Sequence, residues 1–67
     1  MKIDEVIKER RKNLGLSQND LAEMSGVSLA SIKNIERGKG NPSFATIGKI
    51  LDIIGIEILF KVRSPFE

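Results

Sequence analysis

The chain of 67 residues is long enough for one domain with a small core. It contains no cysteine and no histidine, which excludes disulfide scaffolds, zinc sites built from thiolates and imidazoles, and hydrolases that depend on either side chain. Its net charge of +2 is only a weak indication of an anionic partner. We expect no metal ion and no cofactor, and because so small a core is marginal, we expect a second copy of the chain to contribute to stability.

No segment has the pattern of a membrane span or of an export signal. The longest apolar region, residues 50–62, is interrupted by Asp52, Glu57 and Lys61. The charged N-terminus is followed by no hydrophobic stretch, so we expect a cytoplasmic protein without a membrane partner.

Residues Ile3 to Asn13 are predicted to form the first helix. Ile3, Ile7 and Leu14 recur at helical spacing, with Val6 beside them, and the other positions are mostly charged. Acidic side chains occupy the first turn and basic side chains the last, as the helix dipole favours. Gly15 is predicted to end the helix.

Two short helices are predicted next, joined by the turn Ser25-Gly26-Val27. Ser17 is the predicted N-cap of the first, in a capping box completed by Asp20. Ser28 is the predicted N-cap of the second, which is expected to run to about Arg37. Helices joined by so short a turn containing a glycine form a helix-turn-helix. The side chains predicted to face inward are Leu21, Ala22, Met24, Val27, Ile32 and Ile35.

A fourth helix is predicted from Phe44 to about Ile54, with Ser43 as its N-cap after Pro42. Gly48 lies inside this helix at a cost of about 1 kcal/mol relative to alanine, which suggests close packing against a neighbour. The predicted inner stripe consists of Phe44, Ile47, Leu51 and Ile54, widened by Ile50 and Ile53.

After Gly55 the hydrophobic period changes from helical to alternating. Apolar side chains at positions 56, 58, 60 and 62 predict a β-strand, and no other segment of the chain has such a pattern. A lone strand leaves its backbone groups unpaired, so we expect it to pair with the same strand of a second copy. With the two-fold axis at Leu59, Glu57 faces Lys61 of the second copy. The alternatives are a continuation of the fourth helix or a frayed tail. The predicted dimer strand comprises Ile56, Glu57, Ile58, Leu59, Phe60, Lys61 and Val62.

The order and spacing of several short motifs resemble the phage-repressor (Cro/C1, or Xre-type) helix-turn-helix proteins over residues 3 to 54. The motifs are Leu14-Gly15-Leu16-Ser17-Gln18, Ser25-Gly26-Val27-Ser28, Ile35-Glu36-Arg37-Gly38 and Asn41-Pro42-Ser43. The C-terminal strand pattern is similar to the subset typified by HipB-type antitoxins. The resemblance implies a mostly α fold: a four-helix lambda-repressor-like domain at residues 1–54, and a C-terminal β-strand at residues 55–67 pairing across a homodimer.

The third helix is the predicted DNA reader, because the second helix of such a motif enters the major groove with its N-terminal residues first. Leu29 is an unusual choice for a reader, and its alternative role is packing on the second helix. Asn34 can bond an adenine edge in two places, or can be an ordinary solvated side chain. The predicted base contacts, at positions that the resemblance also assigns, are Ser28, Leu29, Ala30 and Asn34.

Phosphate contacts are expected around the reader and at the start of the second helix, where free N–H groups attract anions. Residues 28–49 carry four cationic side chains against one carboxylate, a net charge of +3, so the basicity is localised as DNA binding requires. Any single lysine among them can also be a plain solvated side chain. The predicted phosphate contacts are Ser17, Gln18, Lys33, Arg37, Lys39, Asn41 and Ser43.

Arg11 and Glu36 occupy positions where the resemblance implies a structural ion pair between the first helix and the end of the third. We expect them to stabilise the fold and not to contact DNA. If the pair is buried, removing one partner leaves a costly unpaired charge.

The sequence predicts a DNA-binding regulator and not an enzyme, since it has no Gly-rich phosphate cradle and no paired acids. The function expected is sequence-specific binding of a homodimeric repressor to double-stranded DNA at a pseudo-palindromic operator. One possible role is the antitoxin of a toxin–antitoxin operon, with a toxin as protein partner. The others are a stand-alone phage, plasmid or restriction-modification repressor, and a protein-interaction module without DNA binding.

Overall fold

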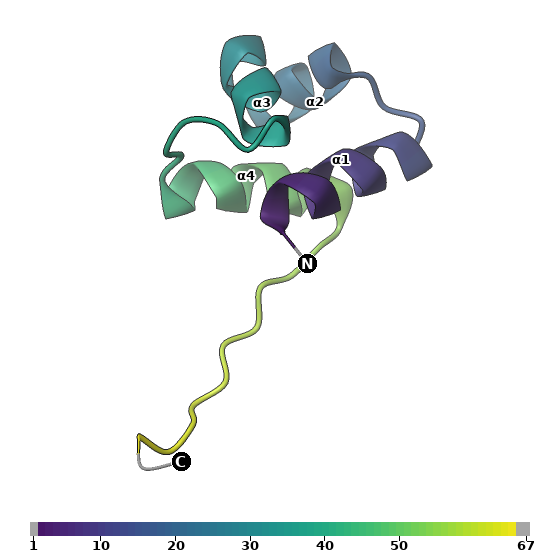
Figure 1. The fold of residues 1–67 in the computed structure, drawn as a ribbon. Coiled ribbons are helices and arrows are strands. Elements are labelled where there is room, and N and C mark those ends of the chain that lie inside the picture. Colours follow the sequence, from purple (N-terminus) through teal and green to yellow (C-terminus); the bar gives the residue numbers. More distant parts are fainter. Residues whose placement is uncertain (1, 66–67) are drawn as a thin grey trace.

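The computed structural model describes residues 2–65, which form four helices followed by an extended C-terminal segment. The helices are α1 (Ile3–Asn13), α2 (Gln18–Ser25), α3 (Leu29–Glu36) and α4 (Phe44–Ile54). The limits of α1 and α4 coincide with the predicted ones. Figure 1 shows the helices gathered together, with the C-terminal segment leaving the end of α4 and pointing away from them.

Three serines begin α2, α3 and α4 as N-caps. The Ser17 hydroxyl accepts the Asp20 N–H at 2.9 Å, and the Asp20 carboxylate accepts the Ser17 N–H at the same distance, which completes the capping box. The hydrogen bond from the Ser17 N–H, and after it the interaction with the Ser17 hydroxyl, lower the pKa of the Asp20 carboxyl. Ser28 and Ser43 accept the backbone N–H groups three residues further on, at 3.2 and 3.0 Å. Local chemistry therefore sets where each of these helices begins.

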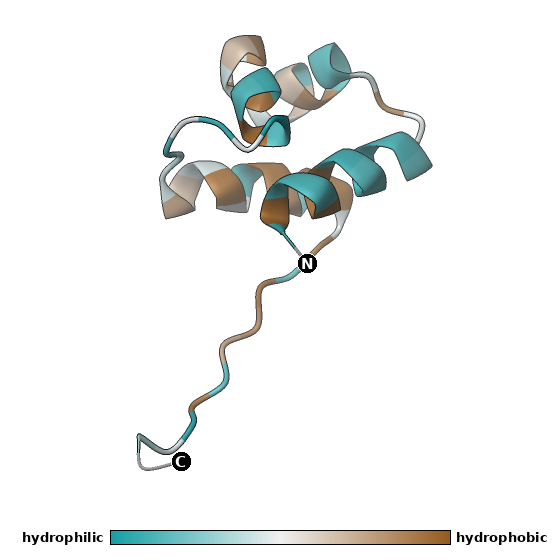
Figure 2. Cartoon of the chain, viewed as in Figure 1, coloured by the Kyte–Doolittle hydropathy of each residue, from teal (hydrophilic) through white to brown (hydrophobic). Residues whose placement is uncertain are grey.

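The core is built from one or two fully buried aliphatic side chains of each helix. α2 packs against α3 and α4, and α1 packs against the same two helices. Val27 is buried within the turn between α2 and α3, as predicted. Figure 2 shows the apolar faces of the helices turned toward one another. The fully buried side chains are Ile7, Leu21, Ile32, Ile50 and Ile54.

Several residues of the predicted apolar stripes are exposed, among them Ile3 and Leu14 at 46% and 43%. The covered face of α2 runs through positions 18, 21, 22 and 25, so Met24 lies outside it and is 55% exposed. Phe44, in the first turn of α4, is 65% exposed, and its ring lies 6.0 Å from that of Phe60. The expected close packing at Gly48 is also wrong, because a Cβ atom there would have no neighbour within 4 Å.

The predicted strand from Ile56 to Val62 is not formed, and residues 2–65 contain no strand at all. The physical reason is that a strand needs a hydrogen-bonded neighbour, and the rest of the single chain is helical. The alternative of a continued helix is also wrong, because Gly55 adopts the left-handed conformation at φ 70° and ends α4. The segment runs extended, with Leu59, Phe60 and Val62 exposed by 85%, 81% and 96%.

The C-terminal segment is fixed to the helices at its first residues. The Arg10 guanidinium donates to the Ile54 carbonyl at 2.9 Å and so links α1 to the end of α4. The Ile56 N–H donates to the Leu51 carbonyl at 3.0 Å, and the Ile56 side chain packs against the core. Among the described residues no helix is long and apolar enough to cross a membrane.

Candidate nucleic-acid interface

The α2–turn–α3 unit presents the start of α3 at the surface of the molecule. Gly26 ends α2 with φ 74°, a conformation that glycine adopts without steric cost, and Ser28 caps α3 only two residues later. The buried side chains of both helices fix the unit on α4 and α1. Because the inner face of α3 is packed into the core, the outer face has a defined position at the surface.

The three residues at the start of α3 differ in the exposure of their side chains and in the hydrogen bonds that they already form. Ser28 is exposed, but its hydroxyl also caps the helix and donates to the Ser31 hydroxyl at 2.9 Å. Ala30 is exposed. Leu29 is half-buried and packs against the core, so the packing role weighed for it from the sequence is present. Only part of the Leu29 side chain faces outward.

Asn34 lies one turn further along α3 and is tied to the loop that follows. Its side-chain oxygen accepts a hydrogen bond from the Arg37 guanidinium. Its backbone carbonyl accepts the Lys39 N–H at 2.8 Å and the Arg37 N–H at 3.2 Å. Asn34 is half-buried, so it is more constrained than an ordinary solvated side chain.

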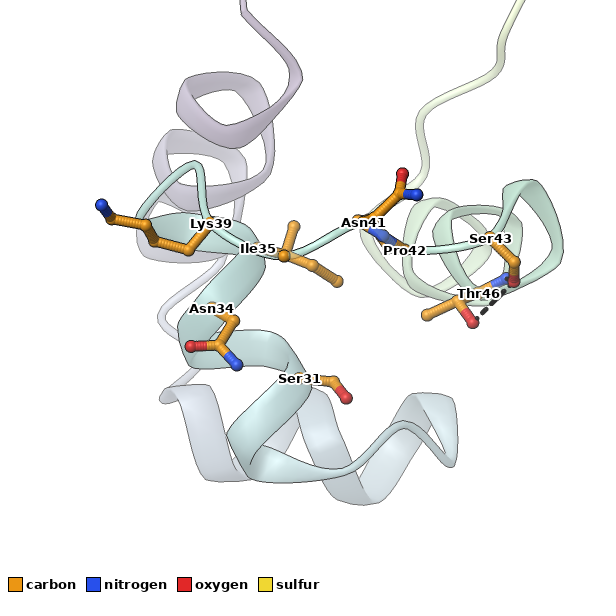
Figure 3. A pocket seen from close by; sticks show the side chains of 9 residues that line it. Ser31, Asn34, Ile35, Lys39, Asn41, Pro42, Ser43 and Thr46 are labelled. Atoms are coloured by element: carbon orange, nitrogen blue, oxygen red, sulfur yellow. Dashed lines mark hydrogen bonds between the residues drawn. The ribbon is translucent and has the colours of Figure 1, made fainter.

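A recess of about 430 Å³ separates α3 from the start of α4. Figure 3 shows Asn34 and Lys39 on one side of this recess, with Asn41 and Ser43 on the other. These four predicted contact residues are thus brought together from α3, the loop and the N-cap of α4. Ser31 and Thr46 also line the recess, and the sequence analysis missed both. Each lies three residues after a capping serine and bonds to its hydroxyl, a signal the sequence contained.

The cations near α3 are exposed, whereas Glu36, the one acidic residue between positions 28 and 49, is buried. A second carboxylate, that of Asp4 in α1, lies beside Gly38 in the loop after α3. Lys33, Arg37 and Lys39 all lie on the surface. Glu36 has a side chain only 2% exposed, and it faces Arg11 in the interior. The surface of α3 and its loop therefore carries positive charge that Glu36 does not offset from outside.

Arg11 and Glu36 form a buried two-point ion pair between α1 and α3. The two hydrogen bonds, from Nε to Oε2 and from Nη2 to Oε1, measure 2.7 and 2.8 Å. A third, from Nη1 to the Leu16 carbonyl at 2.7 Å, satisfies another guanidinium donor. The hydrogen bond to Glu36 raises the pKa of Arg11 against the opposing effect of burial. The pair thus holds the loop before α2 and the end of α3 on α1.

The two predicted phosphate contacts at the start of α2 have internal partners. The Gln18 amide donates to Glu36 Oε1 at 3.3 Å, so it joins the ion pair, and its side chain is half-buried. The Ser17 hydroxyl serves the capping box. The backbone N–H groups of this helix end remain the group best placed to meet an anion.

Comparison with known proteins finds similarity over most of the chain. A family model described as helix-turn-helix matches residues 7–61. The HTH-type transcriptional regulator PuuR of Escherichia coli is 36% identical over 52 residues, which are 78% of this chain and 28% of that protein. The transcriptional repressor RstR of the cryptic phage CTXphi, from Vibrio cholerae, is 38% identical over 58 residues. Those residues are 87% of this chain and 52% of RstR.

A third relative matches over most of its own length. It is an uncharacterized HTH-type transcriptional regulator of Methanothermobacter thermautotrophicus, 40% identical over 52 residues. These cover 78% of this chain and 75% of the relative. The chain thus spans most of this regulator, about half of RstR and about a quarter of PuuR.

Proposed function

Because the chain belongs to the helix-turn-helix family of the phage-repressor (Cro/C1, or Xre) type, we propose that it is a sequence-specific DNA-binding transcriptional regulator. One observation carries the proposal: α3 has small exposed side chains at its start and exposed cations around its end, while Glu36 is turned inward. Small side chains suit base edges, and cations suit the flanking phosphates. An enzyme is not expected.

Base reading is assigned to the outer face of α3. Ser28, Ala30 and Asn34 make the contacts, and Leu29 contributes the outward part of its side chain, for example to a thymine methyl group. Phosphates are held by Lys33, Arg37 and Lys39, by Asn41 and Ser43 across the recess, and by the α2 N-terminus at Ser17 and Gln18. The side chains of Leu29 and Ala30 cannot form hydrogen bonds with base edges, so part of the sequence specificity comes from DNA shape.

The regulator acts as a homodimeric repressor in this proposal. Residues 1–54 bind DNA, and residues 55–67 join two copies by strand pairing about Leu59. The support is the extended, exposed and apolar segment around Leu59, together with the complementary charges of Glu57 and Lys61. Two α3 helices then enter successive major grooves of a pseudo-palindromic operator, with half-sites about 34 Å apart or a multiple of that.

Two regulatory roles follow from different observations. The extended apolar C-terminal segment favours an antitoxin of the HipB-type subset, which would repress its own operon and bind a toxin in the cytoplasm. The similarity to a phage repressor favours a stand-alone repressor. The neighbouring gene discriminates them: a kinase-like toxin gene supports the antitoxin, and its absence supports the stand-alone repressor.

The proposal is tested by titrating the full chain with its own upstream DNA and with a random duplex, each at two salt concentrations. We expect preference for the upstream DNA and a steep loss of affinity with salt, because phosphate contacts dominate the binding energy. An equal affinity for both duplexes, or an affinity indifferent to salt, contradicts the regulator and favours a protein-interaction module.

A further inference from the structure

We propose that Arg37 is a specificity-determining positioning residue, because it fixes the orientation of the Asn34 amide and so selects the base edge that α3 accepts. The inference rests on the proposed function and deepens it. It assigns to Arg37 a role beyond the phosphate contact predicted from its charge.

The geometry begins with the end of α3, where Arg37 is the C-cap. The Arg37 N–H bonds to the carbonyls of Lys33 and Asn34, both at 3.2 Å, so its backbone is fixed. Its guanidinium then reaches back one turn to Asn34. The Asn34 backbone carbonyl is held further by the Lys39 N–H. The two side chains therefore meet from two backbone positions that cannot shift independently.

The chemistry of the contact decides which way the amide points. A guanidinium has donors only, so the Asn34 atom that faces it must be the oxygen. The amide nitrogen then points elsewhere, and Figure 3 shows it directed toward Ser31, opposite to the oxygen. Exchange of the two amide ends would place N–H groups against the guanidinium. Arg37 thus excludes one of the two amide orientations.

A fixed amide orientation has a consequence for base reading. A free asparagine can turn either its acceptor or its donor toward a base edge, and so tolerates several bases. With the oxygen held by Arg37, the nitrogen presents two N–H donors. Donors match the acceptors of guanine and thymine, and the N7 atom of adenine, but they oppose the cytosine N4 amino group. We therefore expect cytosine to be disfavoured at the base that Asn34 contacts.

Lys39 supplies a matched control. It is an exposed cation on the same loop, it lines the same recess, and its bond to Asn34 comes from the backbone N–H, which a side-chain substitution leaves in place. Arg37→Ala and Lys39→Ala each remove one positive charge from this surface. Only the first also releases the Asn34 amide.

The experiment selects binding sites from a randomised duplex pool with the full chain and with Arg37→Ala, Lys39→Ala, Asn34→Ala and Arg37→Ala/Asn34→Ala. Arg37→Ala is expected to weaken the discrimination against cytosine about fivefold or more, at the position that Asn34→Ala also relaxes. The double variant is expected to match the preferences of Asn34→Ala, because the two residues act as one unit. Lys39→Ala is expected to weaken all sites evenly.

Two results overturn the inference in distinguishable ways. If the unmodified chain selects a motif and Arg37→Ala lowers every affinity evenly, as Lys39→Ala does, Arg37 is a phosphate contact only. If the unmodified chain selects no motif, the proposed function itself fails, and the inference fails with it. A measurement on the free protein keeps the contact testable without DNA: the Asn34 side-chain NH₂ resonances should shift in Arg37→Ala and stay in place in Lys39→Ala. Unchanged resonances in both variants contradict the contact.

Discussion

The helices and the C-terminal segment of this chain differ in how their apolar side chains are buried and how their backbone groups are hydrogen-bonded. From Ile3 to Ile54, apolar side chains are buried against one another. The starts of α2, α3 and α4 are capped by serines, and both carboxylate oxygens of the buried Glu36 accept hydrogen bonds from Arg11. From Glu57 onward the chain exposes large apolar side chains and has no ladder of backbone hydrogen bonds in the described residues. The helical region buries most of its large apolar side chains within one chain, whereas the C-terminal segment leaves Leu59, Phe60 and Val62 exposed, as is typical of a surface that binds a partner.

The largest expected effect comes from breaking the ion pair within the helical region. Glu36→Ala leaves Arg11 as a buried, unpaired charge, which costs about 3–5 kcal/mol of unfolding free energy. In a domain of this size such a loss leaves little folded protein at 25 °C. Chemical denaturation followed by circular dichroism measures it.

A control variant and the expected pH dependence make the test of the ion pair more specific. Lys33→Ala, on the exposed face of the same helix, is expected to change stability by less than about 0.5 kcal/mol. Because the Arg11 pKa is raised, the stabilisation by the pair is fully present below the ordinary arginine pKa and is lost only above it. Arg11 therefore contributes no pH dependence of stability near neutrality. A small effect of Glu36→Ala would contradict the role given to the pair.

Removal of residues 58–67 tests whether the C-terminal segment joins two copies of the chain. The truncation keeps Ile56, which packs on the core, so the helices should remain folded while the dimer is lost. Sedimentation should then give a monomer, and affinity for a two-half-site operator should fall far more than affinity for one half-site. An unchanged dimer would refute the strand-pairing proposal.

A charge exchange within the segment offers a finer test of its pairing. Glu57→Lys places a like charge opposite Lys61 of the second copy, and Glu57→Lys/Lys61→Glu restores opposite charges. Glu57→Lys is expected to weaken dimerisation by about 0.2–1 kcal/mol, and the double variant is expected to restore about the same amount. A double variant as weak as the single one would argue against the register centred on Leu59.

Loss of the α2 N-cap is expected to have a moderate effect. Ser17→Ala removes the hydroxyl that accepts the Asp20 N–H and should cost about 1 kcal/mol of unfolding free energy. Asp20 has a lowered pKa in the folded chain, so its contribution is present above its ordinary pKa and declines as the pH falls through the lowered value. Thermal melts between neutral and strongly acidic pH should show this decline in the unmodified chain and a weaker one in Ser17→Ala. Equal declines would argue against a contribution of the Ser17 hydroxyl, since Ser17→Ala keeps the backbone N–H that is the larger cause of the lowered Asp20 pKa.

One substitution within the helical region is expected to give a small gain in stability. Gly48→Ala should stabilise the chain by about 0.5–1 kcal/mol, because a Cβ there meets open space and alanine favours the helix. Gly26→Ala is the matched control and should destabilise, since its φ of 74° strains any residue with a side chain. Denaturant midpoints of the two variants should move in opposite directions.

Local signals predicted the helices well, because capping serines, left-handed glycines and apolar spacing all act within a few residues. The same signals could not place Met24 or Phe44, whose exposure depends on how the short helices pack together. The strand predicted after Gly55 is not formed, because a strand exists only with a hydrogen-bonded partner, and one chain does not supply it. The link between Arg37 and Asn34 required three-dimensional geometry, since arginine at that position indicates charge and not a contact to one amide.

A crystal structure of the chain on its selected duplex would show whether the outer face of α3 reads DNA. We expect Ser28, Ala30 and Asn34 to lie in the major groove, with Lys33, Arg37 and Lys39 along the adjacent phosphates. A complex in which α3 faces away from the duplex, or in which DNA contacts the C-terminal segment instead, would contradict this expectation.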